Sequence, residues 1–248
     1  MNSPLCRHLL LLVLPVLASV VTGHAAPRIY MIGDSTMASK PLNLPERGWG
    51  MALGAFFKAG VTVENHAVNG RSTRSFIDEG RWEKVRTALA PGDFLIIQFA
   101  HNDEKKEDPV RYTDPTTTFR DNLRRFIADT RARQATPILA TPVVRRKFDP
   151  SGKLIDTHGL YPEAVRAVAQ EKKVPLLDLT QSTAAWLQAA GDESSRRFFM
   201  WIEPGVYSEI PYGRKDDTHF VEAGAAKVAD LAVAEIRRQK LPLARWLK

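Results

Sequence analysis

The chain has 248 residues and a formal net charge of +7, and hydrophobic residues make up 44% of it. This length is enough for one large domain or two small ones with a substantial core. The single cysteine, Cys6, lies in a segment that we expect to be removed. Disulfides, cysteine–metal sites and a cysteine nucleophile are therefore excluded from the mature protein.

Residues 1–25 have the pattern of a secretory signal peptide. Arg7 precedes an apolar run over residues 9–21, and small residues follow it as far as Ala26. A membrane anchor is the alternative, but the run is shorter than the roughly 20 residues that a spanning helix needs. We expect cleavage near Ala25 or Ala26 and a secreted or periplasmic protein.

Apolar runs typical of strands then alternate with patterns typical of helices. Strands are predicted over residues 28–32, 61–66, 94–100, 137–140 and 174–179. Helices are predicted over residues 48–59, 77–89, 117–133, 163–172, 183–189 and 223–238. Short buried strands separated by helices imply βαβ units. We therefore expect an α/β fold, formed by a single three-layer α/β/α domain over residues 26–248 with a central parallel sheet of about five strands.

Three polar motifs follow the first three predicted strands. Gly33-Asp34-Ser35 follows the first strand, residues 69–72 (NGRS) follow the second, and residues 101–103 (HND) follow the third. In open parallel sheets, binding sites form at the carboxyl ends of the strands. These motifs are therefore expected to converge in one site.

Ser35 and His219 are candidates for nucleophilic catalysis. A serine in the turn after a buried strand has free backbone N–H groups nearby, although such a serine also fits a helix N-cap. A serine nucleophile needs a base near neutral pH, and histidine has a suitable pKa. A carboxylate must then fix the histidine tautomer. Asp216 lies three residues before His219 and can fold back onto it, and Asp217 is the alternative partner.

Acyl transfer also needs donors that point at the tetrahedral oxyanion. The candidates are the backbone N–H groups of Ser35 and Gly70 and the side-chain amide of Asn102. Glycine lets the backbone approach a ligand closely. The alternative is that Gly70 and Asn102 are ordinary turn residues.

The ordered set of Ser35, Gly70, Asn102 and His219 resembles the SGNH (GDSL) hydrolase superfamily, whose name lists these four residue types. The chain contains no G-x-S-x-G motif, so it lacks the α/β-hydrolase signature. The resemblance extends from Tyr30 to the C-terminal helix. It implies Ser35, Asp216 and His219 as a catalytic triad.

Six stretches are similar to the rhamnogalacturonan acetylesterase branch of this superfamily. They are residues 47–50 (RGWG), 70–76 (GRSTRSF), 99–103 (FAHND), 141–146 (TPVVRR), 161–164 (YPEA) and 216–220 (DDTHF). This resemblance implies a flavodoxin-like sheet, no metal and no other cofactor. It also implies that acetyl esters on galacturonate residues of pectin's rhamnogalacturonan backbone are hydrolysed through an acetyl-enzyme intermediate.

Four further residues are candidates for substrate binding. Arg71 and Arg145 lie in or near loops after strands, where arginine would suit a galacturonate carboxylate. Trp201 and Tyr207 belong to an aromatic stretch before Asp216 and could form a wall on which sugars stack. The alternatives are surface salt bridges for the arginines and packing against the core for the aromatic residues.

The expected partner is an acetylated acidic polysaccharide, because a positive charge favours a polyanion. The basic residues are dispersed and form no nucleic-acid motif, so no nucleic acid is expected. We further expect a monomer without stable membrane association. The alternatives are an SGNH esterase for acetylated xylan, sialic acid, peptidoglycan or a lipid ester, and a non-catalytic carbohydrate-binding module. Such a module would be expected to have lost Ser35, Asn102 or His219.

Overall fold

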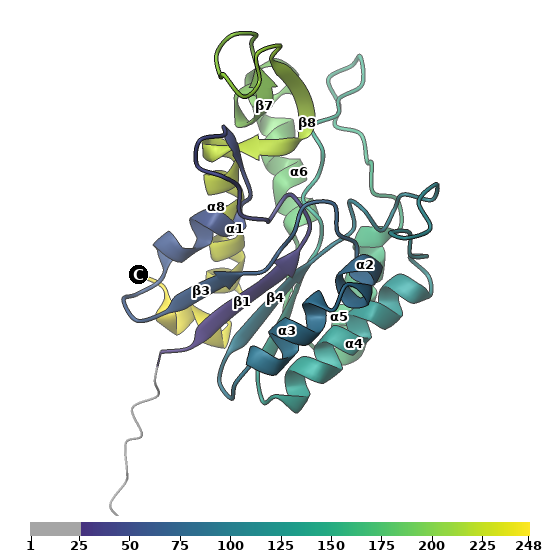
Figure 1. Cartoon of the computed structure of the whole chain (residues 1–248), viewed down its shortest axis with the longest axis vertical. Coiled ribbons are helices and arrows are strands. Elements are labelled where there is room, and N and C mark those ends of the chain that lie inside the picture. Colours follow the sequence, from purple (N-terminus) through teal and green to yellow (C-terminus); the bar gives the residue numbers. More distant parts are fainter. Residues whose placement is uncertain (1–25) are drawn as a thin grey trace, which may run out of the picture.

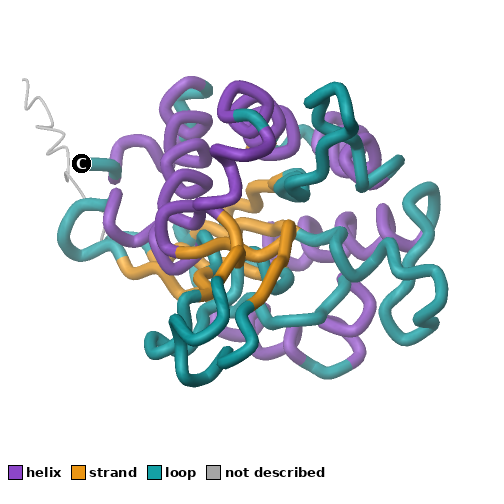
Figure 2. Tube along the Cα trace, turned by 90° about the horizontal axis from the view of Figure 1, so that it is seen from above, coloured by secondary structure: helices purple, strands orange, loops and turns teal. Residues whose placement is uncertain are grey.

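The computed structural model describes residues 26–248, and the signal peptide predicted for residues 1–25 lies outside them. Within the described residues, five parallel strands form a central sheet between two helical layers (Figure 1 and Figure 2). The strands are β1 (Arg28–Gly33), β3 (Thr62–Asn65), β4 (Phe94–Gln98), β5 (Thr136–Ala140) and β6 (Leu176–Leu177). They lie in the order β3-β1-β4-β5-β6. The predicted three-layer α/β/α fold with a parallel sheet is confirmed.

The apolar character of β1 follows from its central place in the sheet. Ile29 and Met31 pack into the core on one face, and Tyr30 and Ile32 pack into the core on the other. Successive side chains of a strand point to opposite faces. A strand that is covered on both faces therefore has to be apolar at every position.

The helices form one layer on each face of the sheet. The first layer contains α1 (Gly50–Leu53), α6 (Leu179–Ala190) and α8 (Glu222–Arg238). The second contains α2 (Thr73–Asp78), α3 (Arg81–Ala88), α4 (Thr118–Ala132) and α5 (Tyr161–Lys172). In α4, Phe119, Leu123, Phe126 and Ile127 are buried. This spacing of three and four residues places them on one face of the helix.

Several predicted elements differ from the structure, and the helix predicted over residues 183–189 begins four residues earlier, at Leu179. The single helix predicted over residues 77–89 is two helices, α2 and α3, because the chain turns at Gly80, whose φ is +69°. The helix predicted over residues 48–59 is shorter and continues as the 3₁₀ turn η1 (Gly54–Phe56). The strand predicted over residues 174–179 has only two residues, because α6 begins at Leu179.

A small antiparallel sheet lies beyond the carboxyl ends of the central strands, at the top of Figure 1. It was not predicted. It is formed by β2 (Glu46–Arg47), β8 (Arg214–Val221) and β7 (Phe199–Ile202), in the order β2-β8-β7. The rings of Phe199 and Phe220 pack with their centroids 5.0 Å apart and join this sheet to the core around α8. The remaining short elements are α7 (Asp192–Ser195), η2 (Arg196–Phe198) and η3 (Pro242–Trp246).

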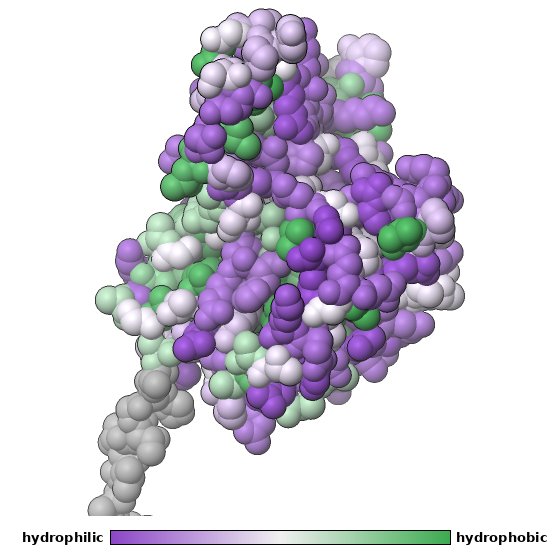
Figure 3. Space-filling model, viewed as in Figure 1, coloured by the Kyte–Doolittle hydropathy of each residue, from purple (hydrophilic) through white to green (hydrophobic). Residues whose placement is uncertain are grey.

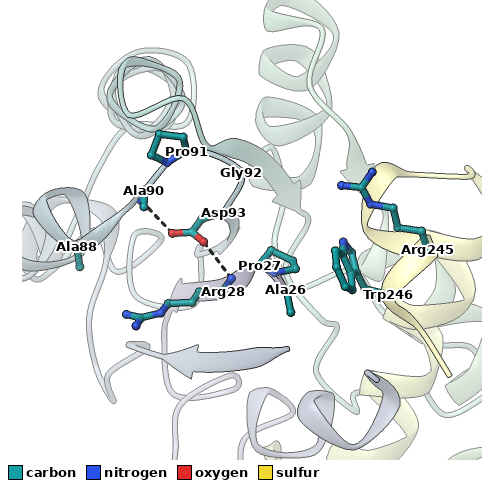
Figure 4. Close-up of a pocket in the computed structure, with 10 residues that line it drawn as sticks. All are labelled: Ala26, Pro27, Arg28, Ala88, Ala90, Pro91, Gly92, Asp93, Arg245 and Trp246. Atoms are coloured by element: carbon teal, nitrogen blue, oxygen red, sulfur yellow. Dashed lines mark hydrogen bonds between the residues drawn. The ribbon is translucent and has the colours of Figure 1, made fainter. Parts of the chain in front are cut away.

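The amino ends of the central strands lie at the opposite end of the molecule. A hollow of about 440 Å³ there is lined by residues that include Arg28, Asp93 and Trp246 (Figure 4). The carboxylate of Asp93 accepts hydrogen bonds from the backbone N–H groups of Arg28, at 3.0 Å, and Ala90, at 2.9 Å. This carboxylate therefore ties the start of β1 to the turn that precedes β4.

Apolar and hydrophilic residues gather in different regions of the surface (Figure 3). On the face drawn in Figure 3, apolar residues gather on the left, where Figure 1 places α1, and the region over α2 is predominantly hydrophilic. Over residues 26–248, no helix combines the length and apolar character needed to cross a membrane.

Candidate active site

The turn after β1 presents Ser35 at the carboxyl edge of the sheet. Gly33 must be glycine here, because a Cβ atom would lie 2.5 Å from the carbonyl oxygen of Gln98. The buried carboxylate of Asp34 accepts hydrogen bonds from the N–H of Thr36, at 3.0 Å, and its hydroxyl, at 2.8 Å. Burial raises the pKa of Asp34, but His101 and Thr36 outweigh this effect and lower it to about 2. The ionised carboxylate thus holds the turn that carries Ser35.

His219 and Asp216 reach Ser35 from a bulge in β8. Phe199 pairs with Phe220, and the next residue, Met200, pairs with Asp216, so residues 217–219 bulge out of the ladder. A bulge of this kind redirects side chains locally. It places His219 Nε2 2.8 Å from Ser35 Oγ and His219 Nδ1 2.8 Å from Asp216 Oδ2.

The surroundings of Asp216 fix the histidine tautomer. The Oδ1 atom of Asp216 accepts hydrogen bonds from the backbone N–H groups of Thr218, at 2.8 Å, and His219, at 3.0 Å. These bonds fix the orientation of the carboxylate. Burial raises the pKa of Asp216, but His219 and these N–H groups lower it well below its usual range. An ionised carboxylate can only accept, so His219 Nδ1 carries the proton and Nε2 is left to accept the hydroxyl hydrogen of Ser35.

Asp217, the alternative partner of His219, faces other residues. Its Oδ1 atom accepts hydrogen bonds from Arg146 Nε, at 2.6 Å, and from Trp201 Nε1, at 2.7 Å. The structure therefore pairs His219 with Asp216 and places Asp217 in a separate contact.

Three donors lie in the loops that follow the first three strands. Within the described chain, the backbone N–H groups of Ser35 and Gly70 have no hydrogen-bond acceptor. Asn102 Nδ2 donates one hydrogen bond to the backbone carbonyl of Arg71, at 3.1 Å, and its second N–H remains available as a donor. Arg111 Nη1 lies 3.4 Å from Asn102 Oδ1 and orients this amide. These are the donor types that an oxyanion requires.

Asp103 anchors the loop that carries Asn102. Its buried carboxylate accepts hydrogen bonds from the N–H and hydroxyl of Thr73, at the start of α2, and from the hydroxyl of Thr113, at 2.7 Å. Burial raises the pKa of Asp103 to about 7, although these donors oppose the shift. The side chain therefore ties the start of α2 to two points of the loop between β4 and α4.

A chain of charged groups connects Asp216 to the loop before Gly70, and it was not predicted. Arg214 Nη2 donates to Asp216 Oδ2, and Arg214 Nη1 donates to Glu46 Oε2 at 3.1 Å. The other oxygen of Glu46 pairs with Lys40 Nζ at 2.5 Å. Lys40 also donates to the side chain of Asn69, the residue before Gly70. No motif marks Lys40, Glu46 or Arg214 in the sequence, because Arg214 meets Glu46 only where β2 pairs with β8 and Lys40 meets Asn69 from another part of the chain.

The structure distributes the four predicted substrate-binding residues among different surroundings. Arg71 lines a cavity beside Gly70, where its guanidinium pairs with Glu79. Arg145 pairs with Glu104. Trp201 has the guanidinium groups of Arg146 and Arg196 over its ring, at 4.8 and 4.4 Å from the centroid. Tyr207 lines a shallow hollow together with Leu42, Arg47 and Glu222. Arg71 is therefore the one of the four that lies directly beside an oxyanion donor.

No group of three or more His, Cys, Asp or Glu side chains within residues 26–248 is arranged to hold a metal ion.

Comparison with known protein families shows the family to which the chain belongs. The model of the GDSL-like lipase/acylhydrolase family matches residues 31–227, which include every residue of the site described above. The chain belongs to this family, and it is a carboxylic ester hydrolase.

Two relatives named as rhamnogalacturonan acetylesterases come from Bacillus subtilis. The rhamnogalacturonan acetylesterase RhgT is 41% identical over 217 residues, which cover 87% of this chain and 92% of the relative. The probable rhamnogalacturonan acetylesterase YesY is 35% identical over 218 residues, which cover 88% and 96%. The resemblance to the rhamnogalacturonan acetylesterase branch is confirmed by these matches.

Solved structures share the fold. The crystal structure of YxiM from Bacillus subtilis has a TM-score of 0.75 and 28% identity, and the match covers 88% of this chain and 58% of that one. The acetylxylan esterase Axe2 from Geobacillus stearothermophilus has a TM-score of 0.59 and 18% identity, and the match covers 86% and 94%. The second likeness concerns the fold alone.

Proposed function

We propose that this protein is a secreted serine esterase that removes acetyl groups from rhamnogalacturonan, with Ser35, His219 and Asp216 as its catalytic triad. The observation that carries the proposal is the continuous hydrogen-bonded line from Ser35 Oγ through His219 to Asp216, with both distances at 2.8 Å. The substrate is inferred from the two Bacillus relatives, which are named for this polysaccharide.

The first half of the proposed reaction forms an acetyl-enzyme. Ser35 Oγ attacks the carbonyl carbon of the acetyl ester while His219 Nε2 takes the hydroxyl proton. The negative charge on the carbonyl oxygen is held by the N–H groups of Ser35 and Gly70 and by the Asn102 amide. The tetrahedral intermediate then breaks the bond to the sugar oxygen, and His219 returns its proton to that leaving group.

The second half releases acetate. Water attacks the acetyl carbon of the Ser35 ester, and His219 Nε2 accepts one of the water protons. The same donors hold the second oxyanion. Collapse of this intermediate breaks the bond to Ser35 Oγ, which recovers its proton from His219. Asp216 keeps Nδ1 protonated throughout and stabilises the imidazolium form.

The test is acetate release from acetylated rhamnogalacturonan, with acetylated xylan in parallel, by the mature protein and by Ser35→Ala. The control is Ser39→Ala, which removes an exposed hydroxyl four residues further on. The expected result is release from the pectic substrate that is lost in Ser35→Ala and kept in Ser39→Ala. Release mainly from xylan would contradict the proposed substrate. Full activity in Ser35→Ala would contradict the triad.

Secretion has a test of its own. When the full chain is expressed in a bacterial host, the expected product outside the cytoplasm begins near Ala25 or Ala26. Recovery of the intact chain, with residues 1–25 attached, from the membrane fraction would contradict the proposal.

A further inference from the structure

A cavity of about 390 Å³ opens beside the oxyanion donors of the candidate active site. It lies between the segment that leads into α2 and the loop that follows Asp108, and Gly70, Arg71 and Arg111 are in its lining. Gly70 supplies one donor. Arg111 Nη1 lies 3.4 Å from the amide oxygen of Asn102, which supplies another. The cavity therefore adjoins the place where a reacting ester would be held.

Two arginines in the cavity are each held by a carboxylate. Arg71 Nε donates to both oxygens of Glu79, at 3.1 and 3.0 Å, and Arg111 Nε pairs with Asp108 at 2.5 Å. Both arginine side chains remain about one third exposed, at 33% and 31%. The ion pairs fix the orientation of each guanidinium before any ligand arrives, which reduces the entropy lost on binding.

Each guanidinium keeps a donor group for a ligand. Arg71 Nη1 donates to the carbonyl of Asn69, and Arg111 Nη1 donates to Asn102. The Nη2 groups of both arginines have no acceptor in the part of the chain that the structure describes. Two oriented guanidinium groups with unused N–H donors, in one open cavity, suit a planar anion with two oxygens.

We propose that this cavity is a subsite for a sugar carboxylate, in which Arg71 and Arg111 bind a uronate residue of the polysaccharide that carries the acetyl group. The polysaccharide part of this inference rests on the proposed function. Glu79 and Asp108 balance the charge of the two arginines, so the carboxylate is recognised through directed hydrogen bonds rather than through an excess of positive charge. A neutral sugar or a methyl-esterified uronate leaves these donors without a strong acceptor.

Binding is measured by calorimetry on Ser35→Ala, which is expected to hold a ligand without turnover. The probes are a galacturonate–rhamnose oligosaccharide and the same oligosaccharide with its carboxylates methyl-esterified. Hydrogen bonds to charged groups contribute enough for the acid to bind roughly tenfold or more tightly than the ester. Equal affinity for the two probes would overturn the subsite, and this comparison needs no substitution in the cavity.

Substitutions then locate the subsite. In the Ser35→Ala background, Arg71→Gln and Arg111→Gln are each expected to weaken binding of the acid by roughly tenfold and to change binding of the methyl ester much less. The matched control is Arg86→Gln, on the exposed face of α3, where the guanidinium pairs with Glu83. Equal weakening of both probes, or an equal effect of Arg86→Gln, would contradict the assignment.

The outcomes separate this inference from the proposed function. If the wild-type protein releases no acetate from acetylated rhamnogalacturonan but Ser35→Ala still prefers the acid, the proposed substrate is wrong and the subsite stands. If acetate is released and the two probes bind equally, the substrate stands and the subsite is wrong.

Discussion

Replacement of each aspartate in the Asp216-Asp217 pair gives a sharp test of the geometry. Asp216 accepts hydrogen bonds on both oxygens, from two backbone N–H groups and from His219 Nδ1 and Arg214. In Asp216→Asn only one oxygen remains. If it stays on the backbone donors, the new NH₂ group faces His219 Nδ1, which must then accept. The proton moves to Nε2, and the histidine can no longer accept from Ser35.

The expected loss is large for Asp216→Asn and small for Asp217→Asn. A wrong tautomer in a Ser–His–Asp site lowers kcat by roughly 10⁴-fold, equivalent to about 5.5 kcal/mol in the barrier. Asp217 is 43% exposed, and its buried partner Arg146 keeps an ion pair with Asp192, so the loss of the Asp217 charge costs about 1 kcal/mol of stability. The oxygen of an asparagine can still accept from Trp201. We therefore expect kcat of Asp217→Asn to stay within about threefold of the parent.

The assay is hydrolysis of an aryl acetate, with thermal unfolding of each variant as the control for folding. Both variants are expected to remain folded at the assay temperature. An equal loss of kcat in the two variants would refute the assignment of Asp216 as the partner of His219. So would a folded Asp216→Asn protein with parental activity.

Three further expectations concern residues near the site. Lys40→Met removes a cation whose side chain is 3% exposed and leaves Glu46 with one partner fewer, so the free energy of unfolding in urea should fall by about 3 kcal/mol. Gly70→Ala places a side chain at φ +74°, where the nearest atom, Arg111 Nη1, is 3.9 Å away. Backbone strain without a clash predicts a loss of about 1 kcal/mol of stability, and displacement of the N–H donor predicts a fall in kcat of about tenfold or more. The pKa of Asp34 in the folded protein, about 2, lies below its ordinary value of 3.8. Asp34 should therefore contribute about 2 kcal/mol to the free energy of unfolding above pH 4, and this contribution disappears as the pH falls towards 2.

Each of these expectations has a measurement that can contradict it. Lys227→Met removes an exposed ammonium that pairs with Asp230, and it should change stability by less than about 0.5 kcal/mol. If Lys40→Met changed stability as little as Lys227→Met does, the buried ion pair of Lys40 would contribute nothing measurable to stability. For Gly70→Ala, unchanged kcat would exclude the Gly70 N–H as an oxyanion donor. For Asp34, the unfolding free energy of Asp34→Asn should depend less on pH between 4 and 2 than that of the parent.

The central sheet could be predicted because its inner strands consist mostly of apolar residues. The runs around Ile29–Ile32 and Phe94–Ile97 are apolar at successive positions, which only burial on both faces explains. The motifs that carry Ser35, Gly70 and Asn102 could be placed together because parallel strands share one carboxyl edge. These inferences need only local sequence and the order of the strands.

The small sheet could not be predicted, because its strands depend on distant partners. Residues 214–219 (RKDDTH) are polar and charged, and they form a strand only between β2 and β7. The spacing of Asp216 and His219 favoured their pairing, but the bulge that makes it possible arises from a register shift against β7. The sequence also does not place Arg111 beside Asn102 or Lys40 beside Glu46, because each pair lies along one irregular connection between strands or helices whose path no motif defines.

The hydrogen bond between Ser35 and His219 joins residues 184 positions apart in the chain. We expect contacts between such distant segments to form late in folding, because closing the long loop between them costs chain entropy. A refolding molecule can therefore regain its helices and most of its central sheet while it is still inactive. The return of esterase activity should lag behind the return of the far-ultraviolet circular dichroism signal. During synthesis, the nucleophile emerges early from the ribosome but has no base until β8 has followed it, so the unfinished chain cannot hydrolyse esters.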